Sequence, residues 1–251
     1  MNIQFAVKNE EIYVLEVNPR ASRTAPFVSK ATGVPLPRLA TKIIMGGRLK
    51  DLGLTHEVVP PHVSVKESVF PFARFPGVDA LLGPEMKSTG EVMGIDESFG
   101  LAFAKAQLAA GQRLPLSGTV FISLKDEDKM NLLNTVFLLN DLGFKIVATG
   151  GTSAFIRQHG IPNQRVNKVR ESRPHIVDMI KNGEIDLIIN TTSDNKAITE
   201  SFSIRRAAIT FDIPYTTTVA GAKATALGIK SMAQGELKVK TLQEYHSGIG
   251  H

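Results

Sequence analysis

The chain has 251 residues, of which 43% are hydrophobic and 21% charged, a balance typical of soluble globular proteins. It contains no cysteine, which excludes disulfides and thiol catalysis, and no apolar run is long enough to span a membrane. The net charge of +5 is consistent with ordinary surface variation, and the alternative is an affinity for anionic small-molecule ligands. With no tryptophan and only three tyrosines, the composition does not favour nucleic-acid binding. We therefore expect a cytoplasmic protein with neither nucleic-acid nor membrane partners.

Residues 1–54 open with the pattern of a β-hairpin. Ile3–Val7 and Ile12–Val17 predict two strands joined by a short turn. Because side chains alternate between the two faces of a strand, four residues of the second strand are predicted to share one face. These four are Ile12, Val14, Glu16 and Asn18.

The end of this hairpin has the chemistry of a phosphoryl-transfer site. Glu16 and Asn18 supply a carboxylate and a carboxamide, which are hard oxygen donors suited to Mg²⁺. Arg20 and Arg23 follow and can form paired hydrogen bonds with phosphate oxygens. The motif lies so near residue 1 that these 251 residues leave no room before it for a nucleotide pocket, so we predict an incomplete site.

The segments that follow are less regular. Pro26–Gly33 and Pro35–Gly46 have helix-like patterns. Residues 55–112 are rich in proline and glycine and predict a connector of irregular structure with short strands, closed by an amphipathic helix over Ser98–Ala110.

Beyond residue 112 the pattern changes to a regular alternation of strands and helices. Such alternation predicts an α/β fold, with a doubly wound, mostly parallel five-stranded sheet covered by helices on both faces. The strands are predicted at Thr119–Ser123, Phe144–Ala148, Gln164–Val166, Asp186–Asn190 and Tyr215–Thr217. The helices are predicted at Asp126–Leu142, Thr152–His159, Pro174–Lys181, Asn195–Phe211 and Ala220–Met232.

Three of the predicted strands end in polar residues: Ser123, Thr149–Thr152 and Asn190–Ser193. Ligands of open α/β sheets bind beyond the carboxyl ends of the strands, and a Gly-Gly pair before a helix lets an anion approach free N–H groups. Lys129 and Lys168 lie in segments that can reach the same edge, which predicts phosphate recognition. The alternative is a simple tight turn, with Thr152 or the next serine as an N-cap.

The chain resembles the C-terminal quarter of the carbamoyl phosphate synthetase large chain. The resemblance rests on several motifs spread along the sequence. They are Gln4–Lys8, Glu16–Arg20, Pro26–Pro35, Leu82–Met86, Ser88–Gly94, Val166–Val169, Arg173–Ile176 and Ile188–Thr192. The resemblance divides the chain into the incomplete α+β end of an ATP-grasp module (1–54), a connector (55–112) and a methylglyoxal-synthase-like allosteric domain (113–251).

For the first segment the resemblance implies a role in phosphorylating carbamate with ATP and Mg²⁺ or Mn²⁺. Gln4, Glu16 and Asn18 would correspond to metal ligands, with Arg20 and Arg23 near the transferred phosphoryl group. The complete enzyme makes carbamoyl phosphate, for pyrimidine and arginine biosynthesis, from bicarbonate, two ATP and ammonia released from glutamine. Its partners would be the remainder of the ATP-grasp large chain and a glutaminase small chain, and this chain alone is expected to be inactive.

For the last domain the resemblance implies allosteric control by a nucleoside monophosphate, UMP or IMP. The carried-over contacts, with Ser123 close by, are Lys129, Thr149, Thr152, Lys168, Asn190 and Thr192. It also implies an ornithine site between connector and allosteric domain, formed by Glu67, Tyr215 and Thr217. For Tyr215, packing at a domain interface is an equal alternative. The domain could also mediate formation of a homo-oligomer.

Two other functions stay open from sequence alone. A methylglyoxal synthase would need a catalytic aspartate after the fourth strand of the allosteric domain, where this chain has Asn190–Asp194 in place of the expected motif. A split-gene subunit would assemble with a separate ATP-grasp chain.

Overall fold

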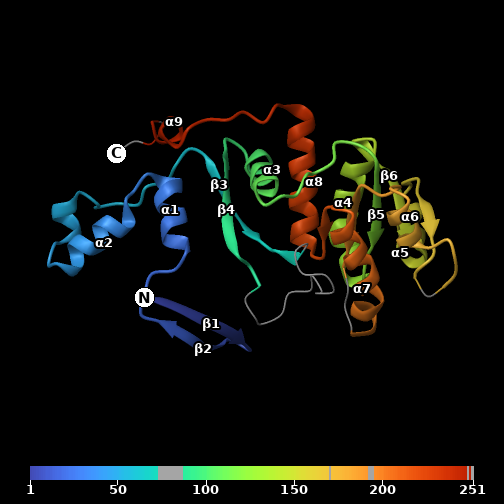
Figure 1. Ribbon diagram of the computed structural model, residues 1–251, viewed down its shortest axis with the longest axis horizontal. Coiled ribbons are helices and arrows are strands. Elements are labelled where there is room, and N and C mark those ends of the chain that lie inside the picture. Colours follow the sequence, from blue (N-terminus) through green and yellow to red (C-terminus); the bar gives the residue numbers. More distant parts are fainter. Residues whose placement is uncertain (73–86, 170, 192–194, 248, 250–251) are drawn as a thin grey trace. The chain divides into compact units, whose positions relative to one another are not determined.

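The computed structural model describes residues 1–72, 87–169, 171–191, 195–247 and 249, with the backbone alone for 195–200 (Figure 1). The chain divides into two compact units, Met1–Val63 with Lys238–His251 and Ser64–Leu237. Within the described ranges, no helix has both the length and the apolar character that crossing a bilayer requires. The functional boundaries near residues 54 and 112 stay predictions.

The first unit consists of a hairpin and short helices. The hairpin turns at Asn9 and Glu10, which both have positive φ. The first helix ends at Gly33, whose φ of 73° is the left-handed conformation common at helix C-termini. The elements are β1 (Asn2–Lys8), β2 (Glu11–Asn18), α1 (Thr24–Thr32), α2 (Leu36–Ile44), the 3₁₀ helix η1 (Leu49–Leu52) and α9 (Leu242–His246).

A β-bulge changes the faces of this hairpin. Gln4 pairs with Glu16 and Phe5 with Val14, so the antiparallel register passes over Leu15. Because cross-strand partners share a face and neighbours along a strand do not, Glu16 lies on the face opposite Val14. The prediction that Ile12, Val14, Glu16 and Asn18 share one face is therefore wrong.

With this bulge, most polar side chains lie on one face of the hairpin and the apolar side chains lie on the other. One face carries Asn2, Gln4, Ala6, Lys8, Glu11, Tyr13, Glu16 and Asn18. The other is apolar and consists of Ile3, Phe5, Val7, Ile12, Val14 and Val17. The apolar side chains are exposed, for example 55% for Phe5 and 69% for Ile12. A two-stranded ribbon with an exposed apolar face resembles part of a larger layered sheet.

Helix α9 packs against α1 within the same unit. The ring N–H of His246 at Nε2 donates to the carbonyl oxygen of Lys30 at 2.7 Å, and buried His62 contacts the carbonyl of Ala31 at the same distance. The ring of Tyr245 meets that of His62 edge-on. A capping box between Thr241 and Glu244 starts this helix, which the sequence analysis did not predict.

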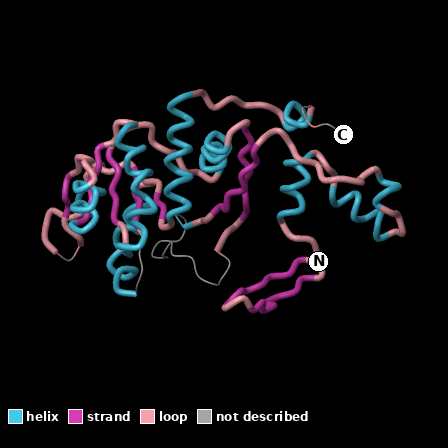
Figure 2. The backbone as a smooth tube through the Cα atoms, turned by 180° about the vertical axis from the view of Figure 1, so that it is seen from behind, coloured by secondary structure: helices cyan, strands magenta, loops and turns pink. Residues whose placement is uncertain are grey.

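The second unit contains a five-stranded, all-parallel sheet in the order β7-β6-β5-β8-β9, lying among helices in Figure 2. This confirms the predicted doubly wound α/β fold. Its strands are β5 (Thr119–Ser123), β6 (Lys145–Thr149), β7 (Gln164–Val166), β8 (Leu187–Asn190) and β9 (Tyr215–Thr216). Its helices are α4 (Asp126–Asp141), α5 (Gly150–Gln158), α6 (Ile176–Lys181), α7 (Asn195–Thr210) and α8 (Val219–Gln234).

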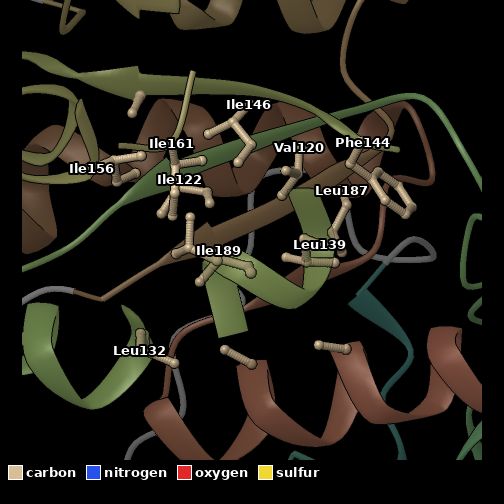
Figure 3. Packing of buried hydrophobic residues seen from close by; sticks show 14 of the residues in the cluster. Val120, Ile122, Leu132, Leu139, Phe144, Ile146, Ile156, Ile161, Leu187 and Ile189 are labelled. Carbon is tan, nitrogen blue, oxygen red and sulfur yellow. The ribbon is translucent and has the colours of Figure 1, made fainter. Parts of the chain in front are cut away.

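Alternating strand residues build a core on each face of this sheet. Val120 and Ile122 of β5 pack with α4, α5 and α8, whereas Phe121 between them packs with α6 and α7. Figure 3 shows Val120, Ile122 and Ile189 among the tightly gathered side chains of the first core. Both faces are buried, as a parallel sheet requires.

The predicted connector contributes β3 (Val63–Val69), β4 (Gly90–Asp96) and α3 (Phe99–Ala109). Glycines allow close packing here. A Cβ on Gly94 would lie 2.0 Å from the carbonyl oxygen of Ala102, and one on Gly100 would lie 2.1 Å from Ser231 Oγ in α8. Helix α3 therefore lies directly against both β4 and the last helix of the α/β sheet.

Helix α6 starts two residues later than the sequence predicts. Pro174 was predicted in the first turn of a helix, but α6 begins at Ile176. His175 is its N-cap, forming a capping box with Asp178. Hydrogen bonding to the His175 backbone lowers the pKa of the Asp178 carboxyl.

Candidate functional site

The carboxyl ends of β5, β6 and β8 form a polar edge held by side-chain hydrogen bonds. The hydroxyls of Ser123 and Thr149 lie 3.1 Å apart. The Thr191 N–H donates to the carbonyl of Ser123, while its hydroxyl accepts from the Lys125 N–H at 3.1 Å. The structure thus brings together the strand ends that sequence analysis selected, and Asn190 pairs in register with Ser123.

Helix α5 begins directly at this edge. Gly150 and Gly151 lie in its first turn, with Thr149 at the N-cap position and no side-chain cap bond. The prediction that the helix starts at Thr152, after a Gly-Gly turn, is therefore wrong by two residues. The first N–H groups of a helix have no partner within it and carry the positive end of its dipole. Two glycines leave that end accessible to an anion.

Thr152 has a structural partner. Its side chain is 2% exposed, and its hydroxyl accepts from the Leu124 N–H at 3.0 Å and lies 3.4 Å from the Leu124 carbonyl. This hydroxyl fastens the turn after β5 to the start of α5. In this arrangement Thr152 presents its backbone N–H, and not its hydroxyl, at the helix terminus.

Lys129 lies across the start of α5. Its ammonium is 2.6 Å from the Asp126 carboxylate and donates to the carbonyl of Gly151 at 3.2 Å. It also lies 6.0 Å from the ring centroid of Phe155. The hydrogen bond from Lys129 holds the pKa of the Asp126 carboxyl below its usual value. The Lys129 ammonium therefore places a positive charge at the sheet edge, and it forms an ion pair with the exposed Asp126 carboxylate.

The remaining predicted nucleotide contacts are Lys168 and Thr192. Lys168 is exposed in the loop after β7, and its backbone N–H donates to the Glu171 carboxylate at 3.0 Å. Thr192 lies outside the described residues, as does Asp194 at the end of the stretch that replaces the methylglyoxal synthase motif.

Asn190 extends from the edge toward the next strand. Its side-chain amide Nδ2 donates to the hydroxyl of Tyr215 in β9 at 3.2 Å. Asn190 is 2% exposed, so its amide needs protein or ligand partners.

A cavity of about 570 Å³ lies within the second unit, beside Tyr215. The three predicted ornithine contacts, Glu67, Tyr215 and Thr217, all line it. The start of α8, capped by the Thr218 hydroxyl, also contributes to its wall. Other lining residues are Phe70, Phe103, Gln107, Arg205 and Asp212.

Glu67 is the partly buried acid of this cavity. Burial raises the pKa of its carboxyl above the ordinary value, opposed by hydrogen bonds from the Ser68 backbone and the Gln107 side chain. A cationic ligand group would compensate this desolvated charge. Arg205, 2% exposed, supplies a buried positive charge in the same wall.

The hairpin holds the predicted metal ligands on its polar face. Gln4 faces Glu16 across the strands, and the Asn18 amide donates to the Glu16 carboxylate. These oxygens fit a hard cation, although a single carboxylate leaves most of the coordination to phosphate or water. Arg20 and Arg23 are exposed beyond the strand.

Comparison with known proteins decides the family. Residues 131–217 match the family described as MGS-like domain, and residues 1–52 match the carbamoyl-phosphate synthase L chain, ATP binding domain. Over 98% of its length, the chain is 53% identical to a carbamoyl phosphate synthase large chain from Rhizobium meliloti and 55% to one from Nostoc. One from Archaeoglobus fulgidus is 53% identical. The chain is homologous to carbamoyl phosphate synthase large chains.

The chain spans 22–23% of the length of these curated large chains. The matched ATP-binding segment contains the hairpin and α1–α2, and the MGS-like match contains the sheet edge from Thr149 to Thr217. The sequence resemblance to carbamoyl phosphate synthetase is thereby confirmed, together with its two kinds of domain.

The sequence alone did not indicate two residues that line the cavity, one contact at the sheet edge and helix α9. Arg205 and Gln107 line the cavity from helices whose sequences carry no binding motif. Thr191 was read as part of a polar strand end, but its hydroxyl instead holds the Lys125 backbone. Only the capping pattern of threonine and glutamate three residues apart could have indicated α9 in advance.

Proposed function

We propose that this chain is the C-terminal regulatory part of a carbamoyl phosphate synthase large chain and that it binds a nucleoside monophosphate, UMP or IMP. The observation that carries the proposal is the uncapped, glycine-rich start of α5 with the Lys129 ammonium beside it. A phosphate there would accept hydrogen bonds from the helix N–H groups and pair with Lys129 and Lys168. Thr149, Asn190 and Thr192 would contribute to the rest of the nucleotide.

The cavity is proposed to bind ornithine. Glu67 and Asp212 provide negative charge, while Arg205 and the start of α8 provide positive charge. A diamino acid presents both ammonium groups and a carboxylate, which matches this distribution. Thr217 and Tyr215 would position the ligand through their hydroxyls.

The ATP-binding segment is proposed to act only with the rest of its module. Gln4, Glu16 and Asn18 would hold Mg²⁺ or Mn²⁺, a divalent ion that offsets the negative charge of the ATP phosphates. Arg20 and Arg23 would contact the transferred phosphoryl group. The apolar hairpin face supports this dependence because it needs a covering layer. The full assembly, with a glutaminase small chain, would make carbamoyl phosphate in the cytoplasm from bicarbonate, glutamine and two ATP.

A thermal-shift screen tests the regulatory assignment. UMP, IMP and ornithine should each raise the melting temperature of the purified chain, because ligands of the native state stabilise it. Lys168→Ala should weaken nucleotide binding about tenfold or more, the value of a charged hydrogen bond. Lys145→Ala is the matched control, because this exposed lysine starts β6 at the opposite end of the sheet. Equal calorimetric affinities of both variants and wild type would contradict the assignment.

Two activity assays complete the test. The chain alone should make no carbamoyl phosphate from ATP, bicarbonate and ammonia, and production without a partner would overturn the proposed dependence. The chain should not convert dihydroxyacetone phosphate. Conversion that is lost in Asp194→Asn would instead establish a methylglyoxal synthase. Sedimentation of the chain with and without nucleotide measures any homo-oligomer.

A further inference from the structure

Arg165 is a second cationic side chain beside the start of α5. It is the middle residue of β7 and pairs in register with Ala148 of β6. Paired residues of neighbouring strands share a face, and Ala148 belongs to the core that packs against α5. The side chain of Arg165 therefore lies on the face of the sheet that α5 covers, where that helix begins.

The flat guanidinium of Arg165 faces Gly150, the first residue of α5. A Cβ on Gly150 would lie 3.5 Å from Nε, 3.5 Å from Nη2 and 3.6 Å from Cζ of Arg165. Because these three distances are nearly equal, that position is above the guanidinium plane and not at its edge. The N–H groups point outward in the plane, so Gly150 leaves them available. Among the described residues, Arg165 forms no hydrogen bond or ion pair, and it is exposed.

Positive charge gathers around the first turn of α5. The Lys129 ammonium lies 3.6 Å from where a Cβ on Gly151 would be, so the two adjacent glycines are next to two different cations. The helix start adds the positive end of its dipole, where a cation is unfavourable. Asp126 offsets the charge of Lys129, but none of the described acidic residues pairs with Arg165. Without a ligand this arrangement costs free energy, and an anion shared by all three groups would offset that cost.

We propose that Arg165 is a further phosphate-binding residue of the sheet edge, which raises the affinity for a phosphate monoester over that for the unphosphorylated nucleoside. This role rests on the proposed function, because the edge must bind a nucleotide. A phosphate monoester has three terminal oxygens that accept hydrogen bonds. The N–H groups of α5 and the Lys129 ammonium leave part of this capacity unused, and a guanidinium can supply two parallel hydrogen bonds.

This role gives Arg165 opposite effects on folding and on binding. Arg165→Ala removes a cation from the positive end of α5, so the ligand-free chain should melt at the wild-type temperature or above it. The same change removes a phosphate contact, so the nucleotide should bind about five- to tenfold more weakly. A residue that only supports the fold would instead lower the melting temperature of the ligand-free chain.

Calorimetric titration of the 251-residue chain with UMP or IMP, whichever binds wild type more tightly, measures the affinities. Arg157→Ala is the matched control, because it removes the same charge from an exposed arginine in the last turn of α5. About 10 Å of helix separates Arg157 from Gly150, so affinity should stay within about twofold of wild type. Arg165→Lys keeps the charge without the planar pair of donors, so its affinity should lie between those of Arg165→Ala and wild type.

Wild-type affinity in Arg165→Ala would overturn the role of Arg165 and leave the proposed function intact. Equal losses of affinity in Arg165→Ala and Arg157→Ala would also overturn it, because net charge alone would then account for the effect. A lower melting temperature of ligand-free Arg165→Ala would overturn it as well, since Arg165 would then support the fold. Failure of both UMP and IMP to bind the wild-type chain would overturn the proposed function together with the role of Arg165.

Discussion

The five-stranded sheet and the β1–β2 hairpin both carry polar groups where strands end, but their faces differ. The sheet buries apolar side chains on both sides, and hydrogen bonds fix its polar edge. The hairpin separates a polar from an apolar face, and its apolar face is exposed. Hydrogen bonds therefore order the polar groups of the first region, whereas the polar groups of the second lack a layer that would order them.

This difference shows that a binding motif and a binding site are separate things. Glu16 has the donor chemistry for a metal, yet it is exposed on a ribbon. The start of α5 carries little charge of its own but is held by buried threonines and a lysine. Four substitution pairs test the comparison.

The largest effect is expected when a buried isoleucine of the sheet is compared with an exposed isoleucine of the hairpin. Ile122 is fully buried in the sheet, whereas Ile12 is 69% exposed in the hairpin. Ile122→Ala should lower the free energy of unfolding by about 2–5 kcal/mol through lost burial and a cavity. Ile12→Ala should change it by less than about 0.5 kcal/mol. Urea unfolding followed by circular dichroism measures both, and a large loss in Ile12→Ala would show that the hairpin face is covered in solution.

The next comparison concerns polar bonds. Thr152→Val keeps the shape but removes the hydroxyl bonded to the Leu124 backbone. We expect a loss of about 1–3 kcal/mol in unfolding free energy because buried backbone groups lose their partner. Asn18→Ala removes the half-buried amide bonded to exposed Glu16 and should cost at most about 0.5 kcal/mol. An unfolding free energy close to wild type in Thr152→Ser would confirm that the hydroxyl bond stabilises the fold. Equal losses of unfolding free energy in the valine and serine variants would contradict this role.

Two glutamates provide the third test. Glu67→Gln should weaken ornithine binding about tenfold, through loss of a charge-assisted bond. Glu16→Gln should leave this affinity unchanged, since Glu16 lies in the other unit. Isothermal titration calorimetry at neutral pH measures the ornithine affinity of both variants. Equal affinities would show that Glu67 does not contribute to ornithine binding.

The pH dependence of Glu67 follows from its raised pKa. Above that pKa the carboxylate is charged, so it can bind an ammonium group, but its burial destabilises the fold. Glu67→Gln should therefore melt at a higher temperature than wild type at neutral pH. The difference should shrink as pH falls through the raised pKa and vanish below the unfolded value near 4.5. A difference that grows on acidification would contradict the assigned cause.

The smallest effect is expected at Lys129. Asp126→Asn removes the exposed carboxylate that shares its ammonium, leaving the charge to a phosphate ligand. Nucleotide affinity should rise about two- to fivefold, the range of an exposed ion pair, and the gain should shrink at high salt. Glu127→Gln, which breaks a neighbouring ion pair with Lys125, should change affinity less. Weaker nucleotide binding in Asp126→Asn would mean that Asp126 positions Lys129 for the ligand.

The centre of the α/β sheet was predictable because β5, β6 and β8 are short, mainly apolar runs between turn signals. The predicted strands at Thr119–Ser123 and Gln164–Val166 match the structure at both ends. The hairpin faces were not predictable, because no glycine marks the bulge at Leu15 and the shift appears only in the register. A period of two is reliable only while the strand stays regular.

The site was predictable in its residue types and less so in its contacts. Polar strand ends indicated the edge, but the partner of Thr152 lies 28 residues away in sequence and is set by packing. The same holds for Asn190 and Tyr215, which are 25 residues apart. Such pairs depend on strand order, which local sequence patterns do not specify.

The contacts of α9 with α1 have a consequence for synthesis on the ribosome. Residues 64–237 form one unit, so that unit can fold once its own residues have emerged. The other unit opens with β1 but needs residues 238–251 to place Tyr245 against His62 and His246 against Lys30. Within these residues, the contacts of α1 with α9 can therefore form only after residues 238–247 have been synthesised.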